Sequence, residues 1–137
     1  MANLPPHTRR GARGLGIVAT PRERLVEMAK KCHDTGLSVA IHAIGDRGID
    51  LALDAIEEAR RQNPRIGIRH RIEHCALCTP RQIERIKSLK AIPSSSIGYM
   101  WEVGEAYVEN FGPEKAMWLF PHKSYLEEDI VTSGNSD

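Results

Sequence analysis

The sequence contains no run of eighteen apolar residues, and no apolar stretch near its amino terminus resembles the core of a signal peptide. Its net charge is only +1, because 19 Lys and Arg are balanced by 18 Asp and Glu. No overall electrostatic field therefore attracts nucleic acid or a membrane surface. The sequence has only three cysteines, an odd number that argues against a disulfide scaffold and fits a reducing compartment. We therefore expect a cytoplasmic protein with no membrane segment and no nucleic-acid partner.

The 137-residue chain is too short for a complete eight-stranded (β/α) barrel, which typically needs roughly 250 residues. Its composition, 41% hydrophobic and 27% charged, is typical of one ordinary globular domain. Residues 1–16 are rich in Pro, Gly and Arg and show no periodicity, which predicts an irregular N-terminal segment. The packed domain is therefore expected over residues 17–137.

Three amphipathic helices are predicted from capping signals and apolar spacing. A capping box at Thr20-Pro21-Arg22-Glu23 predicts a helix over 21–33, and a second box at Thr79-Pro80-Arg81-Gln82 predicts another after it. Between them, Asp46 is expected to cap a helix that ends at Asn63-Pro64. Its apolar stripe consists of Ile49, Ala52, Leu53, Ile56 and Ala59.

Four short strands alternate with these helices, over 37–42, 66–74, 91–97 and 130–137. Pro93 disfavours a central position for the third strand. Residues 98–129 form a longer excursion that holds all seven aromatic residues, and we expect it to be partly helical. The order of elements predicts parallel strands joined by right-handed crossovers, and so an α/β fold. A flavodoxin-like open sheet and a piece of a (β/α) barrel both fit this order.

Three residues that can bind metal stand at the carboxyl ends of these strands: His42, His74 and Asp137. His42 and His74 are 32 residues apart, about one strand-helix unit, and Asp137 lies 63 residues further on. In parallel α/β folds such ends meet at one edge, where two imidazoles and a carboxylate suit zinc, manganese or iron. The plainer alternative is that both histidines are ordinary interior residues, and spacing alone favours it.

The sequence around these residues favours the metal site over two ordinary interior histidines. His42-Ala-Ile-Gly-Asp46-Arg47, then Arg71-Ile-Glu-His74, and finally Ser133-Gly-Asn-Ser-Asp137 stand in this order over the region 21–137. In order and spacing they resemble the carboxyl half of the amidohydrolase superfamily, and most closely the branch of the N-substituted formamide deformylases. The first two motifs together are far more specific than a single histidine.

This resemblance implies a metal-dependent hydrolase that cleaves amide, formamide or cyclic amide bonds, on a partial (β/α)8 TIM barrel comprising about strands 5 to 8. It implies that His42, His74 and Asp137 are the metal ligands of the fifth, sixth and eighth strands, with a divalent metal, most simply zinc. The metal would polarise the carbonyl and activate water, while Asp137 takes the proton of that water and passes it to the leaving nitrogen. Asp46 and Arg47 are expected to cap their helix and brace His42.

The chain also departs from the family. The family's first strand carries a His-x-His pair and its fourth a further ligand, and no such strands precede Pro21. Ile92-Pro93-Ser94 stands where relatives often show Gln-Pro. We therefore expect a partial gene product, inactive or weakly active alone, whose open barrel edges and apolar inner face favour a homo-oligomer. The alternative is a non-catalytic α/β half-barrel module that self-associates.

The remaining candidates have plainer interpretations. The charges of the second strand, Arg69, Arg71 and Glu73, must either pair with one another or lie near an end of the strand, and the sequence leaves both open. Glu73 is expected to pair with Arg69 or Arg71. Cys75 and Cys78 form a Cys-x-x-Cys step without a second ligand pair, which disfavours a zinc or redox site. The aromatic residues of 98–129 are either a substrate wall or the packing of that segment on its own core. Ser94-Ser95-Ser96 shows no nucleophile signature, and His7, His33, His70 and His122 show no constellation.

Overall fold

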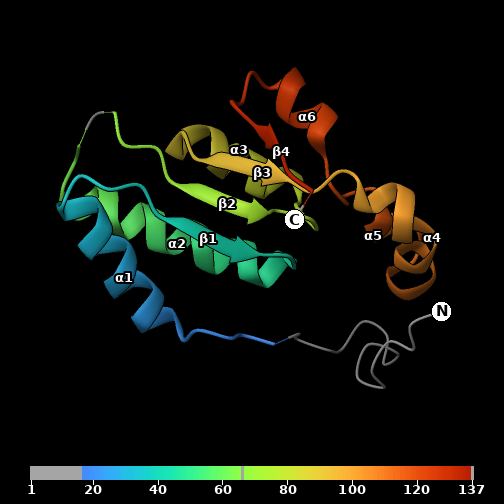
Figure 1. Ribbon diagram of the computed structural model, residues 1–137, viewed down its shortest axis with the longest axis horizontal. Coiled ribbons are helices and arrows are strands. Elements are labelled where there is room, and N and C mark those ends of the chain that lie inside the picture. Colours follow the sequence, from blue (N-terminus) through green and yellow to red (C-terminus); the bar gives the residue numbers. More distant parts are fainter. Residues whose placement is uncertain (1–16, 66, 137) are drawn as a thin grey trace.

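The computed structural model describes residues 17–65 and 67–136, and the predicted irregular segment 1–16 lies outside them. Its centre is a four-stranded sheet in which each strand lies beside its successor and all pairs are parallel (Figure 1). The strands are β1 Ala40–Ala43, β2 Arg71–His74, β3 Ile92–Ser95 and β4 Ser133–Gly134. A flavodoxin-like sheet would have its strands in the order 2-1-3-4-5, so the observed order is that of a (β/α) barrel segment.

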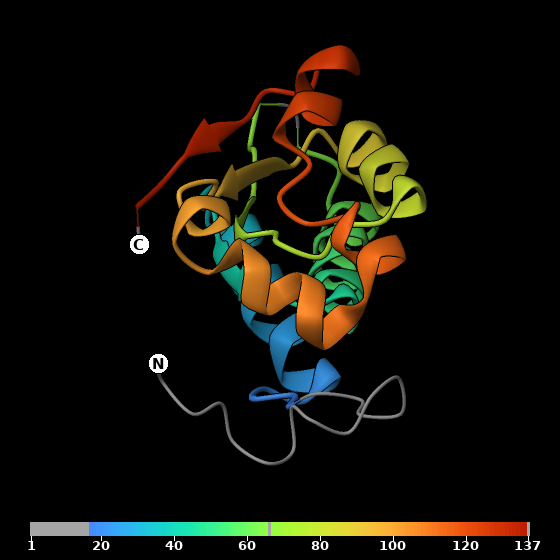
Figure 2. The ribbon, with the colours of Figure 1, turned by 90° about the vertical axis from the view of Figure 1, so that its right-hand side faces the viewer.

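Helices precede and connect the strands, and the two that lead into β2 and β3 cover one face of the sheet. The helices are α1 Arg22–Asp34, α2 Asp46–Gln62, α3 Pro80–Leu89, α4 Tyr99–Phe111, α5 Pro113–Ala116 and α6 His122–Glu127. In Figure 1 the arrowheads of β1, β2 and β3 point toward the side on which α4 and α5 lie. Figure 2 looks from that side and shows α4 in front of the strands. The carboxyl ends of the strands therefore face the predicted partly helical excursion. None of the described helices combines the length and apolar character that crossing a membrane requires.

The core lies between the sheet and α2. The predicted stripe of α2 is confirmed, because every one of its five members is at most 1% exposed. It packs with Ile41 of β1, Ile72 of β2 and Ile86 of α3 in one cluster. The 3.6-residue period of the apolar positions turns one side of α2 toward the sheet, and the charged residues face water. The strand residues that alternate with Ile41 and Ile72 point to the face of the sheet away from the helices.

The start of α3 is fixed by the predicted capping box. The backbone N–H and the hydroxyl of Thr79 lie 2.9 and 3.1 Å from Oε1 of Gln82, and the Thr79 side chain also caps the helix backbone. The Nε2 of the same Gln82 donates to the carbonyl of Asp46, the first residue of α2, at 2.7 Å. Gln82 is 2% exposed, so its amide joins the starts of two successive helices inside the protein.

Arg85 of α3 makes a second connection between α3 and α2. Its guanidinium contacts carboxylates one turn apart on α2, with distances of 3.3 Å to Asp50, 2.9 Å to Asp54 and 2.8 Å to Glu57. The Arg85 side chain is 21% exposed, which reduces the screening of these ion pairs by water. The network holds the outer surface of α3 against α2, while the apolar stripe holds the inner surface.

Several predicted boundaries are wrong. Thr20 makes no capping box, because α1 begins at Arg22 with Pro21 as its N-cap residue. The N-cap residue of α2 is Gly45, and Asp46 is the first helical residue, whose carboxylate accepts the N–H of Arg47 at 2.7 Å. All four strands are shorter than predicted.

Pro93 does lie in a central strand, contrary to expectation. Pro93 has no N–H to donate, and none is needed at this position, because Ile92 donates to the β2 side, at the carbonyl of His70, and pairing with β4 begins one residue later, at Ser94. The Pro93 carbonyl is satisfied by the hydroxyl of Thr132, at 2.7 Å.

The face of the sheet opposite the helices differs from the expected apolar inner face. On β1 and β2 this face carries Ala40, His42, Arg71 and Glu73, of which only Glu73 is partly buried and the others are exposed. Small or charged residues alternate with Ile41 and Ile72 along these strands. Because the isoleucines pack against the helices, the small and charged side chains point to the opposite face of the sheet. The expectation of an apolar inner face is therefore wrong for these two strands.

Candidate metal centre

The two predicted histidine ligands lie side by side at the carboxyl edge of the sheet. His42 stands in β1 and His74 ends β2, and the register pairs His74 with Ala43, one residue beyond His42. The two rings meet edge to face, with centroids 4.6 Å apart. His42 is exposed, whereas His74 is only 6% exposed. Neighbouring parallel strands thus bring together two imidazoles separated by 32 residues in the sequence, because the carboxyl ends of such strands meet at one edge.

The backbone turns sharply at His74. Its φ is 65°, and that of Cys75 is 45°, both in the left-handed region that few residues other than glycine and asparagine adopt. The turn ends β2 at His74 and takes the chain away from the sheet. The His74 ring is held by Ser96, whose hydroxyl lies 2.8 Å from Nδ1. The position of the His74 ring is therefore fixed by both the backbone and a side-chain hydrogen bond.

The third predicted ligand, Asp137, lies outside the described residues. Among residues 17–65 and 67–136, no group of three or more histidine, cysteine and acidic side chains could hold a metal ion. This part of the chain therefore provides two of the three predicted ligands.

Glu73 is turned away from His74 and pairs with Arg71, as predicted. The pair is bidentate, with Nε to Oε1 at 2.8 Å and Nη2 to Oε2 at 2.9 Å. Register places Glu73 directly beside His42 on the same face of the sheet. The ion pair thus occupies the exposed face next to His42, where the charge of Arg71 offsets that of Glu73.

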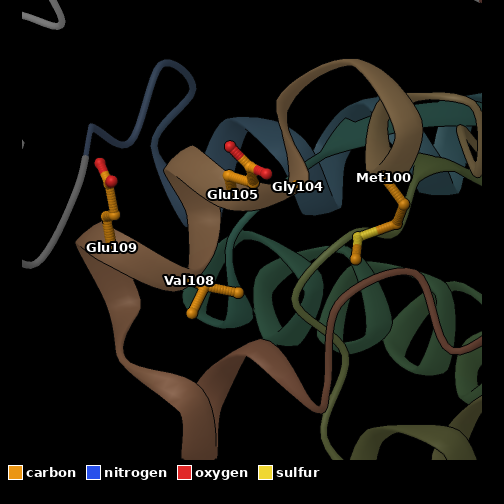
Figure 3. Close-up of a pocket in the computed structure, with 5 residues that line it drawn as sticks. All are labelled: Met100, Gly104, Glu105, Val108 and Glu109. Atoms are coloured by element: carbon orange, nitrogen blue, oxygen red, sulfur yellow. The ribbon is translucent and has the colours of Figure 1, made fainter.

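Two hollows lie near the excursion. A cavity of about 80 Å³ adjoins the end of β3 and is lined by Ser96, Gly98, Tyr99, Glu102, Asn135 and Ser136. A larger, open groove is formed by Met100, Gly104, Glu105, Val108 and Glu109, all of α4, and in Figure 3 the two carboxylates lie together on one side of it. Neither candidate ligand lines the groove, so only the smaller cavity belongs to the same neighbourhood as His74.

The Cys-x-x-Cys step forms a buried thiol pair. Cys75 and Cys78 are both 0% exposed and unoxidised. The hydrogen bond to Cys78, together with burial, raises the pKa of the Cys75 thiol. The same hydrogen bond lowers the pKa of the Cys78 thiol, against the effect of its burial. Both thiols are nevertheless enclosed, and a redox cysteine must be accessible to its partner, so burial disfavours a redox site.

The aromatic residues of the excursion pack mainly on one another. Phe120 contacts Tyr99 and Tyr107 edge to face, with centroids 6.3 and 6.0 Å apart, and Tyr107 stacks on Phe111. They join a small second core around Leu77 and Leu119. Trp101 is 95% exposed and takes no part in it. The sequence left open whether these rings form a substrate wall or pack segment 98–129 on its own core. Their contacts are those of packing.

A second histidine pair lies at the opposite end of the sheet, where the sequence indicated no constellation. His33, near the end of α1, and His70, just before β2, are both 0% exposed and 3.0 Å apart from Nδ1 to Nε2. The N–H of Val39 donates to Nδ1 of His70, so the proton of that neutral ring is on Nε2 and is donated to His33. The Nε2–H of His33 in turn donates to the carbonyl of Asn63, at 2.6 Å. The backbone groups at the two ends thus fix both rings as neutral tautomers.

We expect this pair to make the stability depend on pH. Burial, together with the nearby His33 and Arg60, lowers the pKa of His70 to about 4, against about 6.5 in an unfolded chain. Between these values the unfolded chain binds one more proton, so the free energy of unfolding rises with pH. The contribution of His70 is complete above about pH 6.5 and falls by up to about 3 kcal/mol as the pH drops to 4. Urea unfolding at several pH values measures how the free energy of unfolding depends on pH between 4 and 6.5. We expect this dependence to be weaker in His70→Gln. An unchanged dependence would show that His70 does not cause it.

The comparisons with known proteins agree with the observed sheet. Residues 4–137 match the model of the amidohydrolase family. The chain is 34% identical to an uncharacterized metal-dependent hydrolase of Pyrococcus furiosus, with a TM-score of 0.70 over 88% of this chain and 24% of that one. It is 30% identical to the N-substituted formamide deformylase of Arthrobacter pascens, and 29% identical to the protein LONG AFTER FAR-RED 3 of Arabidopsis thaliana. These two matches cover 81% and 88% of this chain.

The chain spans only 20% of the length of each of these two curated relatives. The strand order and the match to the metal-dependent hydrolase confirm the predicted α/β fold as part of a (β/α) barrel. Because the family model covers nearly the whole chain, the chain belongs to the amidohydrolase family.

Proposed function

We propose that this chain supplies about strands 5 to 8 of a metal-dependent hydrolase that cleaves carbon-nitrogen bonds of amides, formamides or cyclic amides. The observation that carries the proposal is the pair of imidazoles, His42 and His74, at the carboxyl edge of a parallel sheet, with centroids 4.6 Å apart. This edge is where (β/α) barrels carry their catalytic groups. The likeness to an N-substituted formamide deformylase supports this class of substrate.

His42, His74 and Asp137 are the residues that we propose to hold the metal, most simply zinc. Two neutral imidazoles and a carboxylate are a donor set that zinc accepts, and catalytic zinc sites commonly use three protein ligands. A divalent metal bound there would polarise the carbonyl group of the substrate and lower the pKa of a bound water. We further propose that the carboxylate of Asp137 accepts the proton of the attacking water and passes it to the leaving nitrogen as the C–N bond breaks.

The small cavity beside Ser96 and Asn135 is consistent with a small-molecule substrate. Among the residues that line it, Glu102, Tyr99 and Asn135 carry polar groups that can hydrogen-bond an amide. The three cysteines are present as free thiols, which supports a reducing compartment such as the cytoplasm.

We expect the chain to bind close to one zinc ion per copy at neutral pH. Equilibrium dialysis followed by metal analysis measures the stoichiometry, and release of formate from an N-substituted formamide measures hydrolysis. A chain that binds zinc but releases little formate would fit a chain that is weakly active alone. A chain that neither binds zinc nor releases formate would contradict the proposal.

A non-catalytic half-barrel that self-associates is the second candidate. The observation in its favour is that β1 and β4 are the outer strands of the described sheet, since strand edges of this kind pair readily with another chain. This candidate predicts a metal-free homo-oligomer, and size-exclusion chromatography with light scattering detects it. A monomer with bound zinc excludes this second candidate.

A further inference from the structure

Helix α4 presents an apolar surface that the rest of the described chain leaves open. None of its residues, all of which the structure describes, is buried. Met100, Val108 and Phe111 are 38, 43 and 42% exposed, and Trp101 is 95% exposed. Apolar side chains gathered on one exposed element commonly mark an interaction site in soluble proteins.

The open groove of α4 is lined by both apolar and acidic side chains. Its volume is about 490 Å³, and Met100, Gly104 and Val108 follow one another along it at four-residue intervals. Because Gly104 has no side chain, the space between Met100 and Val108 stays open. Glu105 and Glu109 lie together on one side of the groove (Figure 3), and neither carboxylate forms an ion pair within the described part of the chain. The groove therefore suits a segment that carries both apolar side chains and positive charges.

The first sixteen residues of the same chain have the complementary composition. They contain Arg9, Arg10 and Arg13 and no Asp or Glu, whereas α4 contains three Glu and no Lys or Arg. They also contain the apolar Leu4 and Leu15. The net charge of the whole chain is only +1, so these two regions stand out by their opposite charges. Charge complementarity of this kind favours the pairing of the two regions and sets their orientation.

Residues 1–16 are long enough to reach α4. An extended chain spans up to roughly 3.5 Å per residue, so the stretch from Arg9 to Gly16 can reach about 28 Å, close to the diameter of a small domain. In Figure 1 the blue segment before α1 runs from that helix toward the side on which α4 and α5 lie. Because residues 1–16 belong to the same chain, their effective concentration at the groove is on the order of millimolar, and individually weak surface ion pairs are then sufficient. A separate basic peptide or a second copy lacks this advantage.

We propose that residues 1–16 dock on the groove of α4, with their arginines paired with Glu105 and Glu109 and their apolar side chains against Met100 and Val108. The docked segment covers part of the apolar surface of α4, the helix that lies in front of the strands in Figure 2. Salt weakens the docking, because exposed ion pairs are screened. The proposal goes beyond the proposed hydrolysis and does not depend on a bound metal.

Paramagnetic broadening of NMR signals in the full chain tests the docking. A nitroxide is attached at Thr8→Cys, in a chain in which the half-buried Cys32 is replaced by serine; Cys75 and Cys78 are buried and stay unlabelled. We expect the strongest loss of amide signal intensity at residues 104–109 of α4. An absence of loss at α4, or a uniform loss over the whole surface, would overturn the proposal and leave the groove open to another partner.

Glu105→Lys in the spin-labelled chain tests the ion pairs, and Glu84→Lys is its matched control. Both residues are exposed glutamates within helices, and neither forms an ion pair within the described residues. We expect the broadening at α4 to be lost in Glu105→Lys and kept in Glu84→Lys, and to weaken as NaCl is raised from about 0.05 to about 0.5 M. Equal broadening in the two variants would overturn docking at this groove.

A mixed sample identifies the chain to which the docked segment belongs. Spin-labelled chain without nitrogen-15 is added to nitrogen-15 chain without a spin label, so that only contacts between two copies cause broadening. We expect no loss of intensity at residues 104–109 in this mixture. Broadening there as strong as in the singly labelled sample would show that the segment docks on a second copy, and would overturn the proposal of docking within one chain.

Discussion

Zinc binding is expected to be lost in His42→Ala and in His74→Asn, by more than the roughly 10–100-fold typical for loss of a supporting hydrogen bond. Each change removes one of two imidazoles whose centroids lie 4.6 Å apart. Asparagine is chosen at His74 because φ is 65° there, and asparagine tolerates the left-handed region better than alanine does. Isothermal titration of the purified variants with zinc measures the loss.

His122→Ala is the control for these two variants. His122 is half-buried and begins α6, whereas the rings of His42 and His74 contact each other, so its removal takes away one imidazole that is not part of this pair. We expect it to bind zinc as the wild type does. Zinc binding retained in both His42→Ala and His74→Asn, or lost equally in His122→Ala, would show that the metal binds elsewhere in the chain.

Replacing Leu53 by alanine is expected to lower the free energy of unfolding by about 2–5 kcal/mol. Leu53 is 0% exposed in α2 and belongs to the main core cluster, so its truncation removes apolar contacts and leaves a cavity. For a small domain this is a large part of a total stability of about 5–15 kcal/mol. Urea unfolding monitored by circular dichroism measures the shift in the midpoint.

Leu126→Ala is the matched control, because it makes the same chemical change in a helix at a side chain that is 60% exposed. Exposed substitutions of this kind usually change stability by no more than about 0.5 kcal/mol. If the two variants lost the same stability, the α2 stripe would not be the main core of the domain.

Much of the fold could be predicted because the decisive signals are local. The stripe of α2 and the capping box at Thr79 depend on residues within a few turns of one another, and both are present as expected. The pairing of Arg71 with Glu73 was predictable for the same reason, since the two side chains share one face of a strand. Boundaries were less predictable: Pro21 can itself precede a helix, so the Thr20 signal one residue earlier was misleading.

The candidate centre was only partly predictable. His42 and His74 were found because each ends a strand within a specific motif. Ser96 and Asn135 were missed because their role depends on the pairing of β3 with β4, and a serine or asparagine at a strand end is common. The signal that could have found them is their place at the same carboxyl edge. His33 lies in α1 and His70 lies 37 residues later, just before β2, and only the folded chain brings their rings together.

The amide of Gln82 has a consequence for motion. It hydrogen-bonds Thr79 at the start of α3 and the Asp46 carbonyl at the start of α2, so a fluctuation that frees one helix start removes a bond from the other. Local opening in proteins occurs in cooperative units of contiguous structure. The loops that follow β1 and β2 are therefore expected to belong to one such unit, so that a local opening reaches His42 and His74, which precede these loops, together.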